Sequence, residues 1–326
     1  TLAANRQYNP AGIIMDDSGA ISGYYDNQVD NYQQDHFQFH WTQQYSNLWS
    51  SNLGLNYTNG RGYYEEYNNG DGFDYLQLNP VTVGGETINS THNITRKWLD
   101  NDFYVATFSV NYDDDRTNAV LGGSYSNYSG AHFGNLIWAQ YSSNAAPNHR
   151  FYESDATKKD FNIYAKITHQ IGTDWTVYAD LQHRNINYST EGTVKGPATI
   201  SIDDNLSFFN PKAGITYQAS EASRLYISYA KAQREPNRSD YENGNPKPET
   251  LNDYEAGWRY KKEKIQLQAN VYFMDYKDQL VLTGALDEVG EAIRTNSGDS
   301  YRLGLEIEAA IRVADQWVWQ PNLALS

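Results

Sequence analysis

Apolar and polar residues alternate along most of this chain, and helical spacing is nearly absent. Between residues 175 and 184, Trp175, Val177 and Leu181 share one face, opposite Asp180 and Arg184. The longest example runs from residue 301 to 313, where the odd-numbered positions are mostly apolar and the even-numbered ones mostly polar. Successive side chains of a strand point to opposite faces. Each such segment therefore predicts a strand with one apolar and one polar face.

These segments predict an all-β chain of about twelve strands, at residues 33–44, 49–57, 102–113, 118–128, 158–171, 175–188, 208–219, 224–233, 250–261, 264–278, 300–313 and 317–326. The connections between them alternate strictly in length. The short ones are 45–48, 114–117, 172–174, 220–223, 262–263 and 314–316. The long ones are 58–101, 129–157, 189–207, 234–249 and 279–299.

This alternation of connection lengths is typical of an antiparallel, up-and-down transmembrane β-barrel of the outer membrane. Such barrels have short periplasmic turns and long extracellular loops. Aromatic residues also lie near the ends of the apolar faces, as at Trp49, Tyr57, Tyr104 and Tyr112, where membrane barrels carry their aromatic girdles. A soluble β-sandwich is the alternative, but its strands are typically about five or six residues long.

The amino-acid composition excludes several kinds of site and partner but leaves the predicted barrel unchanged. The 326 residues include no cysteine, so no disulfide framework or thiolate metal site is expected. A net charge of −15 argues against nucleic acid as a partner. The mean hydropathy of −0.75 would suggest a soluble protein, but a barrel with one wet face per strand and long polar loops gives the same average.

No motif in the chain predicts an enzyme, a cofactor or a metal centre. His36 and His40 share a strand face, but four residues separate them by about 13 Å. The run 69–74 lacks the spacing and closing glutamate of a calcium loop. Glu306 and Glu308 lie between two arginines on one face, which favours a solvated charge network over a catalytic pair.

The predicted loops are rich in tyrosine, asparagine, glycine and aspartate. Aromatic rings with a polar end and guanidinium groups suit the binding of a large polar ligand. We therefore expect a ligand-binding set on the extracellular loops, comprising Arg61, Tyr63, Tyr64, Tyr67, Trp138, Tyr141, Arg150, Tyr152, Arg234, Asn237 and Tyr241. Packing of the loops on one another is the alternative for each of these residues.

Several segments resemble a known family. Residues 245–249, Asn-Pro-Lys-Pro-Glu, precede Tyr254-Glu255-Ala256-Gly257 and resemble the Lys-Pro-Glu and Tyr-Glu-x-Gly pattern of TonB-dependent outer-membrane receptors. The strand 271–280 and the Gly-Leu-Glu-Ile-Glu run at 304–308 are similar to the strands that follow in that family. Segments at 8–12, 30–36 and 60–64 resemble receptors of the Bacteroides group.

The resemblance implies that residues 1–326 are the central part of one barrel domain of about 22 strands with a plugged lumen, whose plug, first and last strands lie outside this sequence. It also implies a location in the outer membrane of a Gram-negative bacterium. The expected partners are outer-membrane lipid, the TonB complex acting through the missing plug, and a scarce, bulky nutrient.

A ferric siderophore or other iron complex is the expected ligand, although similar barrels carry haem, cobalamin and glycans. Two other functions remain open on the sequence. One is a complete twelve-stranded passive pore or autotransporter-type barrel, and the other is a secreted β-rich adhesin or glycan-binding domain.

Overall fold

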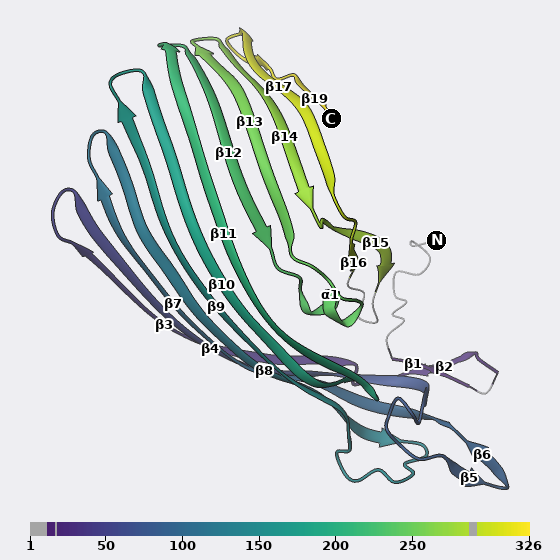
Figure 1. Cartoon of the computed structure of the whole chain (residues 1–326). Coiled ribbons are helices and arrows are strands. Elements are labelled where there is room, and N and C mark those ends of the chain that lie inside the picture. Colours follow the sequence, from purple (N-terminus) through teal and green to yellow (C-terminus); the bar gives the residue numbers. More distant parts are fainter. Residues whose placement is uncertain (1–11, 17, 287–291) are drawn as a thin grey trace.

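The alternating segments pair with their sequence neighbours into one long, curved antiparallel sheet (Figure 1). The computed structural model describes residues 12–16, 18–286 and 292–326. The main sheet comprises β3 (Val29–Gln44), β4 (Trp49–Gly72), β7 (Ser90–Asp113), β8 (Thr117–Ala139), β9 (Arg150–Ile171), β10 (Trp175–Lys195), β11 (Ala198–Ser220), β12 (Ser223–Arg234), β13 (Glu249–Lys262), β14 (Ile265–Lys277), β17 (Ser300–Ala314), β18 (Trp317–Trp319) and β19 (Asn322–Leu325).

The strand order confirms the predicted up-and-down plan. The sheet runs β18-β17-β14-β13-β12-β11-β10-β9-β8-β7-β4-β3, and β19 also pairs with β17. Each predicted strand is found, although the last one, 317–326, is divided into β18 and β19. Within the described part of the chain the sheet is open, because its end strands, β3 and β18, do not pair with each other.

Four of the five predicted long loops are mostly strand, which corrects the expectation at that end of the sheet, whereas in 234–249 only the first and last residues belong to strands. β4 continues to Gly72, and β7 begins at Ser90. The predicted loop 189–207 reduces to a two-residue connection between Lys195 and Ala198. The extensions of β4 and β7, residues 58–72 and 90–101, consist mostly of polar residues and glycine, so they lack the hydropathy contrast that marks a half-apolar strand. The backbone ladder continues regardless of that contrast.

Four small elements lie outside the main sheet. They are the hairpins β1 (Ile13–Met15) with β2 (Ile21–Tyr24), β5 (Val81–Val83) with β6 (Glu86–Ile88), and β15 (Leu280–Leu286) with β16 (Ala292–Asn296), and the helix α1 (Arg238–Glu242). Among the described residues no helix is long and apolar enough to cross a membrane, a finding that does not bear on crossing by strands.

The two faces of the main sheet differ in chemistry, and we call them the apolar face and the polar face. On the apolar face large side chains such as Phe37, Ile227 and Leu303 are more than half exposed. Aromatic pairs mark both ends of this face. Tyr57 stacks between Phe37 and Tyr104 with ring centres 5.9 and 4.7 Å away, whereas Trp175 contacts Tyr217 at 4.4 Å beside the short turns.

A small cluster of buried apolar side chains lies at the end of the sheet away from the short turns. Phe73, Leu76 and Leu78 of the β4–β5 connection pack there against Leu136 and Phe151. The apolar face of the main sheet is not covered by any described element in this way. Its solvent must therefore be something other than water, as in a membrane barrel.

Glycines on the polar face receive tyrosine rings from the adjacent strand. Gly257 lies opposite Tyr226, and Gly304 opposite Tyr272. A Cβ atom built on either glycine would overlap the facing ring. Ring-over-glycine contacts of this kind help to set register and curvature in barrels.

We predict that Gly257→Ala lowers the free energy of unfolding by about 1–3 kcal/mol, the usual cost of forcing extra volume into a packed site. Urea unfolding in detergent micelles measures the change. Gly214→Ala on the same face is the control, because its Cβ would lie 3.3 Å from its nearest neighbours and needs only a small adjustment. A Gly257→Ala/Tyr226→Ser double variant should regain part of the loss; strictly additive costs would contradict the contact.

Candidate ligand-binding site

The segment after β12 folds back onto the polar face of β9, β10 and β11 and carries α1 (Figure 1). Asn237 caps the helix, accepting a hydrogen bond from the Asp240 backbone at 2.9 Å. The Asp240 side chain accepts in return from the Asn237 backbone at 2.8 Å. This reciprocal capping box satisfies two backbone donors of a very short helix, and it fixes the chain direction just after Pro236.

Ion pairs tie the start of this segment to the sheet. Glu235 accepts hydrogen bonds from Arg184 at 2.8 and 2.9 Å and from Lys158 at 3.0 Å. Arg184 also binds Asp160 on the neighbouring strand, with its closest contact at 2.6 Å. Although burial opposes ionisation, the bonds from Arg184 and Lys158 lower the pKa of Glu235 to about 2. The carboxylate therefore stays charged at any physiological pH.

The helix itself is held from three sides. Arg238 donates to Ser154 of β9 at 3.0 Å and pairs with Glu242 one turn later at 2.7 Å. The Tyr241 hydroxyl donates to Asp204 of β11. Asp240 is buried and accepts two bonds from Arg294 of β16 at 2.7 and 3.0 Å. α1 is therefore a fixed part of the polar face.

A cavity of about 250 Å³ lies between this segment and the sheet. β8 to β11 supply one wall and the α1 segment supplies the other. Its lining residues are Tyr128, His132, Ala156, Lys158, Ile186, Tyr188, Leu206, Glu235, Pro236, Asn237, Arg238 and Tyr241. Apolar surface with a few convergent polar groups is the usual composition of a small-molecule site.

The cavity combines aromatic hydroxyls with cationic groups. The ring centres of Tyr188 and Tyr241 lie 5.8 Å apart. The pKa of Tyr241 is raised, mainly by burial and also by its hydrogen bond to Asp204. Burial, together with the nearby charge of Arg238, lowers the pKa of His132 to about 4. His132 is therefore neutral at pH 7. The cations of the cavity are Lys158 and Arg238, which pair with Glu235 and Glu242. An aromatic or anionic group would find both stacking surface and charge-assisted donors there.

Three of the predicted ligand-binding residues belong to this segment. Tyr241 and Asn237 line the cavity. Arg234 ends β12 and binds Glu249 at 3.1 Å. All three were expected on a loop, and their polar groups also bond within the chain, because the loop is folded onto the sheet.

The predicted residues of β4 lie on both faces of the strand instead of on a loop. Arg61, Tyr63 and Tyr67 are on the side that continues the apolar face, and Tyr64 is on the polar side. Arg61 lies over the ring of Trp98 at 5.5 Å and pairs with Asp100 at 3.3 Å. The alternation of a strand separates these tyrosines, which adjacency in sequence had grouped together.

The remaining predicted residues are spread over β8, β9 and their connection. Trp138 is the penultimate residue of β8 and is exposed, whereas Tyr141 packs against the small apolar cluster. Arg150 of β9 lies over the Phe133 ring at 4.2 Å. Tyr152 is next to the Gly134 position, on the side of the sheet that carries Lys97. None of these four lines the cavity under α1.

The sequence reading missed the strand residues of the site. Tyr128, Lys158 and Tyr188 come from predicted strands, and His132 and Leu206 come from the extensions of β8 and β11. The sequence feature that could have found them is the alternation of the strand that places Arg184 on the polar face. Continuing this alternation beyond residue 188 predicts which later residues share that face.

No group of three or more potential ligands that could hold a metal ion occurs among residues 12–16, 18–286 and 292–326. His36 contacts Thr58 at 2.9 Å.

We predict that acidification from pH 7 to pH 5 destabilises the fold through His132. Its pKa is lower in the folded than in the unfolded chain, so the unfolded chain gains the proton first and the free energy of unfolding falls, by up to about 2 kcal/mol at pH 5. The loss begins near the unfolded pKa and is complete below about pH 4. Thermal unfolding in micelles at several pH values measures it. His132→Asn should flatten this dependence, whereas the distant His40→Asn should not; equal profiles in all three proteins would contradict the assignment.

Comparison with known proteins agrees with this geometry. Residues 2–326 match the family model described as TonB dependent receptor-like, beta-barrel. The pesticin receptor of Yersinia enterocolitica is 34% identical over 70 residues, which are 22% of this chain and 10% of that receptor.

Solved structures share the fold at low identity. The siderophore receptor PiuA from Acinetobacter baumannii superimposes with a TM-score of 0.57 at 15% identity, covering 90% of this chain and 48% of that one. The copper transporter OprC gives a TM-score of 0.61 at 15% identity, covering 90% and 46%. The chain thus spans about half the length of these structures. The resemblance to Bacteroides receptors stays a prediction.

The family comprises receptors and transporters of the Gram-negative outer membrane, so the apolar face of this sheet faces lipid and the polar face lines the barrel. On the strength of the family match along residues 2–326 and the matching sheet, the chain belongs to the TonB-dependent receptor β-barrel family.

Proposed function

We propose that this chain is part of an outer-membrane receptor that binds a ferric siderophore or other iron complex and imports it with energy supplied by TonB. The cavity under α1 carries the proposal. It lies on the polar face, at the end of the sheet opposite the short turns, which is the extracellular end in this architecture. A nutrient entering the barrel from outside would meet it.

The chemistry of the cavity supports an iron complex with an aromatic or anionic organic part. Lys158 and Arg238 supply positive charge, and Tyr128, Tyr188 and Tyr241 supply ring surface. Catecholate and phenolate groups are both anionic and aromatic, so they suit this combination of neighbours. We infer that the site performs selective binding and that no catalytic step takes place in it.

The size of the cavity limits what it holds. About 250 Å³ is below the 300–1,000 Å³ of typical sites for whole small molecules. We therefore infer that it receives one arm of a bulky complex, and that the rest of the ligand contacts other parts of the receptor.

The test is binding of a panel of iron(III) complexes, namely a ferric catecholate, a ferric hydroxamate and ferric citrate, to the purified receptor by tryptophan fluorescence. We predict that the catecholate binds, and that Lys158→Ala or Arg238→Ala weakens binding roughly tenfold, the value of one charge-assisted hydrogen bond. Uptake of the same complexes by a deletion strain carrying each variant measures transport.

Two controls separate the possible outcomes. Glu242→Gln removes the partner of Arg238 but keeps its cation, so binding should persist. Arg61→Ala alters the other side of the sheet and should leave the affinity unchanged. If Arg61→Ala weakened binding as much as Arg238→Ala, the ligand would not be held under α1. If no iron complex bound, the siderophore proposal would be dropped.

A further inference from the structure

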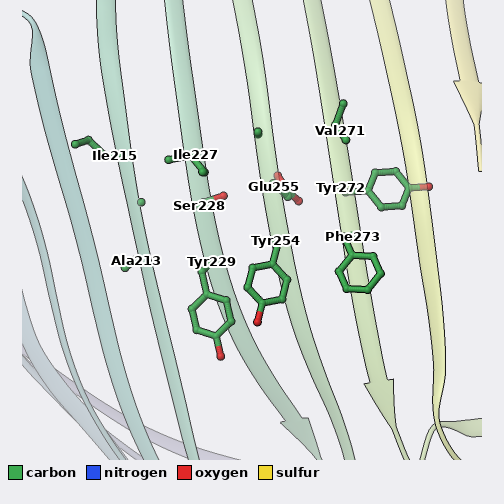
Figure 2. Close-up of a pocket in the computed structure, with 12 residues that line it drawn as sticks. Ala213, Ile215, Ile227, Ser228, Tyr229, Tyr254, Glu255, Val271, Tyr272 and Phe273 are labelled. Atoms are coloured by element: carbon green, nitrogen blue, oxygen red, sulfur yellow. The ribbon is translucent and has the colours of Figure 1, made fainter.

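Two hollows interrupt the apolar face of the sheet, and neither belongs to the site under α1. The larger, of about 570 Å³, crosses β11 to β14. Figure 2 shows the rings of Tyr229, Tyr254 and Phe273 side by side at its rim, with Ile227 and Val271 beyond them. Strand alternation directs the nearby Glu255 side chain to the polar face, so the surface of the hollow on the lipid side is apolar.

An alanine with large neighbours forms part of the wall of the larger hollow. Ala256 is in register with Ile227 on one side and Val271 on the other. Along its own strand it lies between Tyr254 and Trp258, whose indole is fixed by a hydrogen bond to Ser223 at 2.8 Å. A missing side chain amid bulky ones leaves a groove that follows the strand.

The second hollow repeats this arrangement on β3, β4, β7 and β8, with a volume of about 440 Å³. Ala106 is in register with Leu55 and Tyr125, and along β7 it lies between Tyr104 and Phe108. Both sites therefore have the sequence Tyr-x-Ala-x-aromatic, at 104–108 and at 254–258. Two separate strands thus produce the same shape.

The two hollows also lie at the same depth. β7 and β13 both run toward a short turn, which follows Asp113 in one case and Lys262 in the other. In each motif the tyrosine is the residue farther from that turn. The tyrosine hydroxyls at this level are bonded to polar side chains, as in Tyr57 to Asp102 at 2.7 Å and Tyr229 to Asn252 at 3.0 Å. The rims therefore mark the extracellular interface, and the hollows open into the outer leaflet.

We propose that each hollow seats an acyl chain of the outer-leaflet glycolipid, lipopolysaccharide. The hollows are continuous with the lipid-facing surface of the barrel and offer an apolar ligand rings and branched aliphatic groups. Side chains that line an empty hollow lack dispersion contacts on that side. A flexible saturated chain can follow the groove along the strand and restore them, while its head group lies at the level of the tyrosine hydroxyls.

The experiment places a large side chain in each of the two hollows. We compare the receptor extracted from its own outer membrane with an Ala106→Trp/Ala256→Trp variant, and we quantify the lipopolysaccharide and phospholipid that remain bound after detergent washing by mass spectrometry. Filling the two hollows should lower the amount of retained lipopolysaccharide about threefold, because the acyl chains lose packing contacts. Tryptophan is well tolerated on a lipid-facing surface, and the thermal midpoint reports whether the variant folds.

Ala269→Trp is the matched control, because Ala269 is also an alanine of this face, in register with Trp258 and Ile307 and outside both hollows. It should retain lipopolysaccharide like the parent protein. Equal retention in the double variant and the control would overturn the proposal. So would retention of phospholipid alone by the parent protein.

Discussion

The structure depends on one constraint: a sheet that exposes apolar side chains to lipid must satisfy its backbone groups within itself. A backbone N–H or C=O without a partner costs several kcal/mol in hydrocarbon. The uninterrupted antiparallel pairing from β3 to β17 meets this requirement strand by strand. It also explains why the chain needs almost no buried apolar core, because the lipid solvates the face that a soluble sheet would have to cover.

The same ladder positions the polar groups of the candidate site. Because the pairing register is continuous, Lys158, Arg184 and Asp204 from three strands reach one patch of the polar face. α1 has only five residues, too few to be stable alone. Its place therefore depends on the ion pairs of Glu235 with that wall and of Asp240 with β16, and on the hydrogen bond from Arg238 to Ser154. The cavity is the space left between a rigid sheet and a segment held by charge.

The two faces also divide the aromatic residues into two roles. On the apolar face, rings form rows at the membrane boundaries and enclose the alanine-floored hollows. On the polar face, tyrosines cover glycines of the next strand or line the cavity. One residue type suits both places because its ring is apolar and its hydroxyl needs a partner.

The sequence by itself determined the fold class, the order of the main strands and the two faces of the predicted strands, because a period of two is a local property of each strand. It also placed short turns at one end. Strand length beyond the membrane was decided only by pairing, since segments such as 58–72 and 90–101 lack hydropathy contrast but find partners across the sheet. The cavity was likewise set by tertiary structure. It joins β8 to β11 with a segment near residue 238, and no local pattern encodes which distant charges meet. Tyr63 and Tyr64 show why closeness in sequence does not predict a shared site: adjacent residues of a strand point to opposite sides of the sheet.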